Sequence, residues 1–345
     1  CSSDLDVAEA YDGIAQNVVS IAERQHSEII HLRQFNNWIK SVLIEKYCPK
    51  DASIFDCACG KGGDIPKWKL KDPRLFVFSD ISSDSLKRAY QKYQKMKKAC
   101  KAYFYAGNAF SDNMLKRINE IPGNVTFDIT SCQFAFHYAF KDESLARSAV
   151  NNLCNKLVPG GICILTIPNA CRIVKMLRES NDNTKIGNRL FSIQRYFDID
   201  NIPMFGAEYV FNLVESVDNC AEYLVHPQVL ISLFQENKCE LIETMPFHEY
   251  YHTCLTSFPT MKMLYSDLLE RLGIQNAEMT PEEWEIIGLY SFFVFRKRGE
   301  KSRQKNKYEP KGNEFEIIDL ETGSKSTVDI SSEKNNINRS EERRV

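Results

Sequence analysis

The feature that most constrains this chain is an apolar run that ends in glycines and precedes a second apolar run ending in a carboxylate. The first run, from Ile54 to Asp64, is IFDCACGKGGD, and the second, from Phe76 to Asp80, is FVFSD. Glycines reach positive φ and let a ligand lie against bare backbone, while a helix that begins after Asp64 aims unsatisfied N–H groups at the turn. Asp80 is placed to accept hydrogen bonds from a ribose diol. The spacing predicts a loop that binds an adenosine-containing cofactor.

The glycine loop alone is a weak signal. Position 65 is Ile, so Gly60-x-Gly62 lacks the third glycine of the dinucleotide fingerprint G-x-G-x-x-G. A pyrophosphate cofactor is therefore disfavoured. A glycine-rich turn that binds no ligand is the alternative interpretation.

Apolar runs alternate with helical patterns along the first half of the chain. Residues 17–47 have helical periodicity and precede the first expected strand. Strands are expected at 53–58, 74–79, 102–106, 125–131 and 162–167. Strands that alternate with helices form a parallel, doubly wound sheet, so the predicted fold is α/β with an N-terminal helical cap.

The alternation breaks after Pro168. The region from about 180 to 225 is polar and aromatic, and we expect it to be a lobe inserted above the sheet edge. Further elements are expected beyond it: a helix near 227–237 and strands near 239–245 and 287–296.

The last part of the chain differs in composition from the rest. From residue 299 onward it is rich in Lys, Glu, Ser, Asn and Gly, with few aromatic residues. Such a segment buries too little apolar surface to fold. We therefore expect one domain over residues 1–298 and a disordered tail over 299–345.

Composition limits the classes of partner. The formal net charge is −2, so a polyanionic partner must be met by local basic patches. The twelve cysteines are scattered and form no C-x-x-C pair, so we expect reduced thiols, a nuclear or cytosolic protein and no metal. No apolar run approaches the length of a membrane span, so no membrane partner is expected.

Open sheets of this kind bind ligands at the carboxyl ends of their strands. After the fourth expected strand, the segment from Cys132 to Phe140 is CQFAFHYAF. It mixes polar groups with aromatic rings, as a pocket for a flat base would. In the alternative interpretation the segment is half-buried, and His137 and Tyr138 have structural roles.

Several motifs in one order resemble the mRNA cap guanine-N7 methyltransferase family. The match runs from about residue 10 to 297. The motifs that carry it are FNNWIKSVLI from Phe35, CGKGGD from Cys59, KWK from Lys67, SCQF from Ser131, HY at His137, PGG from Pro159, PN at Pro168, FGAEYVFNL from Phe205, EYLV from Glu222, EWE from Glu283 and LY at Leu289. Chance does not account for so many separate motifs in the same order.

The resemblance implies a class I, Rossmann-like methyltransferase fold whose inserted lobe binds the cap. It implies an enzyme that transfers the methyl group of S-adenosylmethionine to N7 of the terminal guanine of a GpppN cap. The capped 5′ end of mRNA is then the partner, with the capping machinery and RNA polymerase II as further partners and the nucleus as the location.

The resemblance also assigns site residues position by position. The cofactor falls to Lys40, Ala58, Gly60, Asp80, Asn108, Gln133 and Tyr138, with Asp80 at the ribose and Asn108 at the adenine. The cap falls to Asn36, Asn37, Lys61, Lys67, Lys92, His137, Glu222 and Tyr290.

Two positions depart from the family pattern. Ala58 stands where Gly is usual, which is acceptable if φ there is negative. Asn108 stands where an adenine-contacting Asp is usual; its amide oxygen still accepts from the adenine amino group, but without charge assistance. Weaker cofactor binding is the expected result.

The chemistry requires no catalytic base. Guanine N7 has a free lone pair and no proton to remove, so the step is an in-line displacement that depends on alignment and electrostatics. As the purine gains positive charge, its N1–H and exocyclic amine become better donors, and a carboxylate there binds the transition state more tightly than the ground state. Glu222 is the candidate, and a solvated glutamate at a helix start is the alternative.

Cations are expected along the triphosphate bridge of the cap. Lys61 and Lys67 flank the glycine loop, and Lys92 follows on the helix after Asp80. A solvated helix face is the alternative for Lys92. Core or sheet-edge packing is the alternative for Tyr138 and Tyr290.

Two other functions stay open. A methyltransferase of another substrate would share the cofactor half, although Asn36, Asn37, Glu222 and Tyr290 together argue against it. A catalytically weak cap-binding protein would be consistent with Ala58 and Asn108. Separate measurements of cofactor and cap binding discriminate these functions.

Overall fold

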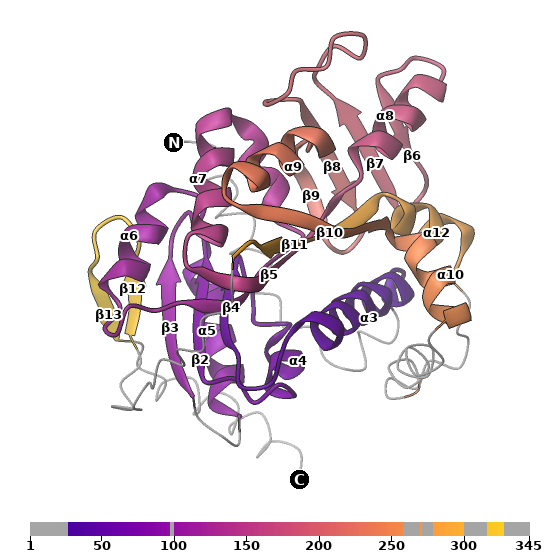
Figure 1. The fold of residues 1–345 in the computed structure, drawn as a ribbon. Helices are drawn as coiled ribbons and strands as arrows, with labels where there is room; N and C mark the ends of the chain where they lie inside the picture. The colour runs from indigo at the N-terminus through magenta and orange to yellow at the C-terminus, as the bar shows by residue number, and fades with distance from the viewer. Residues whose placement is uncertain (1–26, 97–99, 258–269, 271–278, 300–315, 328–345) are drawn as a thin grey trace.

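A computed structural model describes residues 27–96, 100–257, 270, 279–299 and 316–327. The strands of its main sheet are β1 Ser53–Cys57, β2 Leu75–Asp80, β3 Lys101–Ala106, β4 Phe127–Gln133, β5 Leu157–Pro168, β10 Cys239–Pro246, β11 Tyr290–Lys297, β12 Glu316–Asp319 and β13 Lys325–Thr327. Within the described residues they lie in the order β10-β11-β5-β4-β1-β2-β3-β12-β13 (Figure 1). The strands from β5 across to β12 are parallel, and β11 is antiparallel to its neighbours. The predicted mostly parallel sheet is confirmed.

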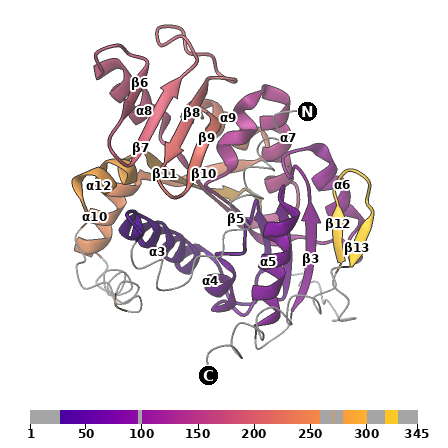
Figure 2. The ribbon, with the colours of Figure 1, turned by 180° about the vertical axis from the view of Figure 1, so that it is seen from behind.

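Helices cover both faces of this sheet (Figures 1 and 2). They are α3 Ile30–Tyr47, α4 Ile65–Lys69, α5 Ser83–Gln94, α6 Asp112–Glu120, α7 Glu143–Cys154, α8 Ala170–Glu179, α9 Pro227–Glu236, α10 Phe247–Ser257 and α12 Pro281–Gly288, with the 3₁₀ helix η1 at Phe136–Lys141. The helical pattern predicted from residue 17 yields a helix that begins at Ile30, and residues 17–26 lie outside the described ranges. The strand predicted at 287–296 begins instead at Tyr290, because α12 continues to Gly288 from a Thr280–Glu283 capping box.

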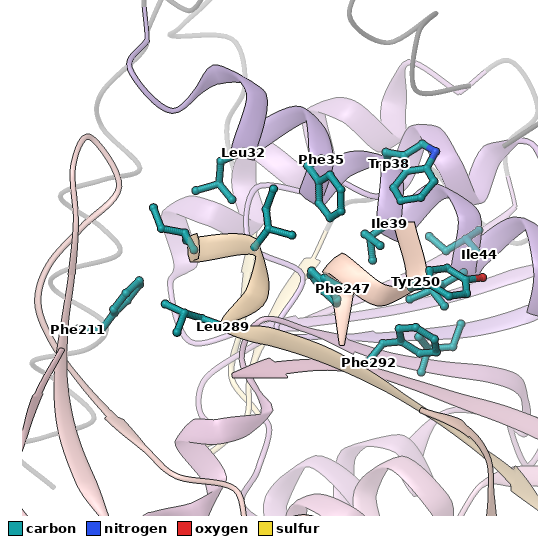
Figure 3. Packing of buried hydrophobic residues seen from close by; sticks show 14 of the residues in the cluster. Leu32, Phe35, Trp38, Ile39, Ile44, Phe211, Phe247, Tyr250, Leu289 and Phe292 are labelled. Carbon is teal, nitrogen blue, oxygen red and sulfur yellow. The ribbon is translucent and has the colours of Figure 1, made fainter. Parts of the chain in front are cut away.

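One face of α3 is apolar and packs on the core. The buried positions include Phe35, Trp38, Ile39 and Val42, at the spacing of a single helical face. They pack in one cluster with Phe247, Tyr250 and Phe292 from α10 and β11 (Figure 3). Burying each such side chain contributes about 1.5–3 kcal/mol. This packing fixes the rotation of α3 and leaves Asn36, Asn37 and Lys40 half-buried on another side.

The region predicted as an inserted lobe forms a second sheet. Its strands are β6 Lys185–Gly187, β7 Phe191–Arg195, β8 Glu208–Leu213 and β9 Val217–Tyr223, paired antiparallel in chain order. This sheet projects beyond the main sheet, with α8 beside it (Figures 1 and 2). Glu222 lies on β9, opposite Tyr209 of β8, and not at a helix start.

The prediction of a disordered tail from residue 299 is wrong for residues 316–327. β12 pairs in parallel with β3, with Ile317 opposite Phe104 and Asp319 opposite Ala106, and β13 returns antiparallel to β12. Ile317 and Leu320 are buried against the domain. A few apolar residues are therefore enough to form a short hairpin where an existing strand supplies the hydrogen-bonding edge. Residues 300–315 and 328–345 lie outside the described ranges.

Candidate active site

Parallel pairing brings the carboxyl ends of four strands to one edge of the sheet. Cys57 at the end of β1 lies opposite Ser79 and Cys132, and Asp80 at the end of β2 lies opposite Ala106. The loops that follow β1 to β4 therefore emerge side by side. This is the position at which open α/β sheets bind ligands.

A cavity of about 270 Å³ opens at this edge. This volume is close to the lower end, roughly 300 Å³, of ligand pockets. The structure brings together, in its lining, all of the residues predicted to contact the cofactor: Lys40, Ala58, Gly60, Asp80, Asn108, Gln133 and Tyr138.

The glycine loop owes its shape to two glycines and one carboxylate. Gly62 has φ +66°, and a Cβ there would lie 2.9 Å from the backbone Cα of Ala89, so no side chain fits. Gly60 has φ +53°, and a Cβ would meet nothing within 4 Å, so its backbone faces open space. Asp80 Oδ2 accepts from Gly60 N at 2.7 Å, and Oδ1 accepts from Ser82 N at 3.0 Å. Because a carboxylate offers about four acceptor sites, Asp80 both holds the loop and retains capacity for a diol.

Alanine fits position 58 without strain only if φ there is negative, but φ of Ala58 is +54°. This is the left-handed region, which costs a non-glycine residue about 1–2 kcal/mol. Ala58 is held there because the next residue, Cys59, donates its N–H to Ser79 O at 2.9 Å. The substitution therefore carries backbone strain directly beneath the cavity.

Replacing Ala58 with glycine should stabilise the protein. Relief of the strain outweighs the extra chain entropy of glycine in the unfolded state, leaving a net gain of about 0.5–1 kcal/mol. Cofactor affinity should rise as well, since the Cβ no longer borders the cavity. Urea denaturation and calorimetric titration measure the two effects.

Ala52→Gly is the matched control. Ala52 is fully buried and is not among the positive-φ residues of the described chain. The same change should therefore lower stability there, by about 0.5–1 kcal/mol. If Ala58→Gly also lowers stability, position 58 is not strained.

Asp64 joins the predicted cofactor side to the predicted cap side. Its Oδ1 lies 2.8 Å from both Lys40 Nζ and Lys67 Nζ. Lys67 also donates to Asn37 Oδ1 at 3.2 Å and to Gly63 O at 3.0 Å. Burial alone would raise the pKa of Asp64, but Lys40 and Lys67 outweigh it and lower the pKa to about 2. The sequence prediction missed Asp64 as a site residue, although it ends the glycine loop at an i,i+3 spacing from Lys67.

A second carboxyl, Asp56, lies behind the loop and also lines the cavity. Its Oδ2 accepts from Trp68 Nε1 at 3.0 Å. Burial, with the charge of Asp64 adding to it, raises the pKa of Asp56 to about 8. Asp56 is therefore protonated at neutral pH, and burying it costs stability once the unfolded chain can ionise.

Replacing Asp56 with asparagine should stabilise the protein increasingly as pH rises. Between the ordinary pKa of 3.8 and about 8, the carboxyl ionises in the unfolded chain but not in the folded one, so the wild type loses stability across this window. Asparagine does not titrate and keeps an acceptor for Trp68. The gain in Tm should be near zero at pH 4 and about 3 °C or more at pH 8.

Asp128→Asn is the control for this pH series. Asp128 accepts from Arg74 Nη2 at 2.6 Å and from Ser53 N at 2.8 Å. Losing its charge should lower Tm, with no gain that grows toward pH 8. An Asp56→Asn curve parallel to the wild-type curve would show that Asp56 ionises normally in the folded protein.

The predicted cap residues His137 and Glu222 lie in contact beside the cavity. Tyr209 donates its hydroxyl to Glu222 Oε2 at 2.6 Å, and His137 Nε2 lies 3.4 Å from Glu222 Oε1. The His137 and Tyr138 rings are 4.3 Å apart, and the Tyr138 hydroxyl lies 3.1 Å from Sγ of Cys220, on the same strand as Glu222. Tyr138 lines the cavity, so His137 and Tyr138 connect Glu222 to it. Glu222 is 5% exposed, which excludes the solvated alternative.

Tyr290, Asn36, Lys61 and Lys92, which are also predicted to bind the cap, do not line the cavity. The Tyr290 ring packs 5.3 Å from the ring of Phe134, which lines the cavity. Asn36 Oδ1 is buried and has no hydrogen-bond partner among the described residues. Lys61 lies in the glycine loop and Lys92 is exposed at the end of α5, and neither lines the cavity.

The adenine end of the predicted cofactor site is the loop after β3. Asn108 lines the cavity, and its Oδ1 accepts from Phe110 N at 3.0 Å. From α7, the Asn152 side chain donates to Ala109 O at 2.9 Å and to Ser111 O at 2.7 Å. The Asn108 side chain therefore shapes its own loop as well as the cavity.

No group of three or more His, Cys, Asp or Glu side chains among the described residues could hold a metal ion. No helix in the described ranges is long and apolar enough to cross a membrane. The described cysteines are free thiols, and burial holds the pKa of Cys59, at the cavity, well above its usual value.

Comparison with known proteins agrees with this geometry. The family model described as the mRNA (guanine-N(7))-methyltransferase domain matches residues 3–298. mRNA cap guanine-N(7) methyltransferase 1 of Oryza sativa subsp. japonica is 36% identical, over 88% of this chain and 84% of its own length. Its namesake in Arabidopsis thaliana is 37% identical over 81% and 78%, and the Schizosaccharomyces pombe enzyme is 34% identical over 80% and 78%. The chain therefore belongs to the mRNA cap guanine-N7 methyltransferase family.

Proposed function

We infer that this chain transfers the methyl group of S-adenosylmethionine to N7 of the terminal guanine of the mRNA cap. The structural observation that carries the inference is the contact of His137 and Tyr138 with β9. It joins the carboxylate of Glu222 to the cavity that contains the predicted cofactor residues. A methyl donor and a purine edge can therefore be held next to one another.

The cavity fits an adenosine-containing methyl donor. Asp80 would hold the ribose and Asn108 the adenine, while Lys40 and the open backbone at Gly60 would face the methionine end. When bound, the cofactor supplies an electrophilic methyl group on a sulfonium. The protein's part is to orient this group and to exclude water, which the mixed polar and apolar lining supports.

Glu222 is held ready for the purine edge. Tyr209 fixes one carboxylate oxygen and His137 approaches the other, so the side chain is oriented before the cap arrives. With about four acceptor sites, the carboxylate can accept further bonds from N1–H and the exocyclic amine of guanine. Those bonds strengthen as the ring becomes cationic, which lowers the barrier without a base.

The triphosphate bridge is assigned to Lys61, Lys67 and Lys92. Lys67 donates to Asn37, Gly63 and Asp64, so each of its three N–H donors has an acceptor. A cap phosphate would therefore have to replace one of these acceptors. The neutral amide of Asn37 is the least costly to replace, since Asp64 carries the opposing charge.

The test is incubation with labelled S-adenosylmethionine and, in parallel, GpppG, GTP, ATP and guanosine. GpppG should be methylated at N7 much faster than guanosine, and ATP should not be methylated. Rising salt should weaken cap binding, because lysines meet the phosphates. Equal rates on guanosine and GpppG would contradict the cap assignment.

We further propose that the chain acts in the nucleus, beside the capping machinery and RNA polymerase II. Its relatives come from plants and fungi, among other eukaryotes, which make mRNA in the nucleus. A tagged chain should co-purify with nascent transcripts from nuclear extract. Recovery from the cytoplasm alone would contradict this location.

A further inference from the structure

The hairpin formed by residues 316–327 lies behind the adenine end of the cavity, beyond the matched family domain, which ends at residue 298. We propose that Leu320 of this hairpin is a positioning residue for cofactor binding. It holds the loop at residues 107–110 in the shape that borders the cavity. The proposal rests on the proposed function, in that the cavity must be the cofactor site.

Leu320 lies directly on the backbone of this loop. Its side chain is fully buried, in one apolar cluster with Ala109 and Phe110. Its N–H donates to Ala106 O at 2.8 Å. A Cβ added to Gly107 would lie 3.0 Å from Leu320 Cβ, which places the side chain against a main chain with φ +132°. The loop after β3 therefore packs under the hairpin with no space to shift toward it.

On its other side, the same loop is hydrogen-bonded to the end of β2, where Asp80 lies. Gly107 N donates to Asp80 O at 3.0 Å, and Asn108, Ala109 and Phe110 line the cavity. The loop is thus clamped between the end of β2 and the hairpin. A change at Leu320 is therefore transmitted to the cavity wall through adjacent backbone.

The hairpin is itself anchored to the domain. From α6, Arg117 donates through Nε to Leu320 O and through Nη2 to Glu321 O, both at 3.2 Å. Both views show β12 and β13 beside β3 and α6 (Figures 1 and 2). These hydrogen bonds fix the position of Leu320 relative to α6.

Protection of the sheet edge is the competing role, since β3 would otherwise be an open edge. Leu320, however, lies one residue beyond Asp319, the last residue of β12. Its N–H bonds to Ala106 at the very end of β3, but its side chain lies against Gly107 of the loop. Edge protection alone predicts losses in solubility and melting temperature, with the cofactor affinity of the folded protein unchanged. A positioning role predicts a loss specific to the cofactor.

The test is Leu320→Ala in the full chain, at a temperature well below its measured unfolding transition. The Kd and KM for S-adenosylmethionine should rise about five- to tenfold, while kcat at saturating cofactor and the KM for GpppG stay within about twofold. Leu320→Met, which keeps the volume, should restore the Kd. Leu320→Val serves if the alanine variant does not fold, with a smaller change in the same direction.

Lys325→Ala on β13 is the control. It removes an exposed ion pair with Glu316 at 2.6 Å and leaves the loop untouched, so the Kd should not change. A melting temperature lowered by Leu320→Ala with an unchanged Kd would reduce the hairpin to edge protection and overturn the proposal. Asn108→Ala distinguishes failure of the Leu320 proposal from failure of the site assignment itself. If the Asn108 variant also binds S-adenosylmethionine normally, the assignment of the adenine end has failed as well.

Discussion

Glu222→Gln should slow methyl transfer from the bound complex by about a hundredfold, the size of effect seen when one preorganised electrostatic group is removed. Glutamine keeps the size of the side chain and an acceptor for Tyr209, which donates to Glu222 Oε2 at 2.6 Å. It removes the charge that favours a cationic purine. Because the unmethylated ring is neutral, cap affinity should change much less than the rate. Single-turnover rates at saturating S-adenosylmethionine, measured beside cap affinity, test this.

Glu208→Gln is the matched control for that experiment. Glu208 lies on the neighbouring strand β8, is half-buried, and also accepts from a tyrosine hydroxyl, that of Tyr223 at 3.2 Å. Its hydrogen bond is to Tyr223, whereas Glu222 lies with Tyr209 and His137 beside the cavity, so the Glu208 variant should retain the wild-type rate. If Glu222→Gln stays within about twofold of wild type, roughly 0.4 kcal/mol in barrier, then Glu222 is a structural acceptor for the Tyr209 hydroxyl.

The gathering of the predicted cofactor residues at one cavity could be anticipated because its determinants are local, while their role in binding the cofactor stays a prediction. Apolar runs that end in glycine or a carboxylate define strand ends, and parallel pairing brings those ends together whatever the connections between them. Asp80 and Gly60 follow from this rule, and the structure places both at one cavity. The motifs of the family extended the list to Lys40, from a helix that no strand rule would have included.

Backbone conformation could not be predicted in the same way. The φ of +54° at Ala58 results from the turn closed by Cys59, Gly60 and Asp80, and the residue type itself favours negative φ. Asp64 was missed for a related reason. Its role depends on Lys40, which lies 24 positions earlier and approaches only when α3 packs on the sheet.

The hairpin at 316–327 shows the limit of composition as a guide. Its strands have four and three residues, too few to form a stable hairpin alone. It is ordered because β3, more than 200 positions earlier, supplies the hydrogen-bonding edge, and Leu320 fills a site over Gly107. Neither partner is adjacent in sequence, so the polar composition around the hairpin predicted disorder.

Asp64→Asn should cause the largest combined loss of stability and ligand binding. Two ammonium groups, Lys40 and Lys67, lie 2.8 Å from one oxygen of this nearly buried carboxylate. Without its charge they face one another uncompensated, at a cost of about 3 kcal/mol, the lower end for breaking a buried pair. Both lysines should then shift, so S-adenosylmethionine and cap affinity should each fall more than about tenfold. Denaturant unfolding and calorimetry measure the three quantities.

The loss of stability should also depend on pH. The pKa of Asp64 is lowered from 3.8 to about 2, so its contribution is complete above pH 4 and disappears as pH falls toward 2. Asp84→Asn is the control, because Asp84 also pairs at i,i+3, with Lys87 at 2.7 Å, but at the surface. That change should cost less than about 1 kcal/mol and leave both ligands bound normally. If Asp64→Asn keeps both affinities within about twofold, Lys40 and Lys67 are positioned by the backbone around them, and the carboxylate does not couple the two halves of the site.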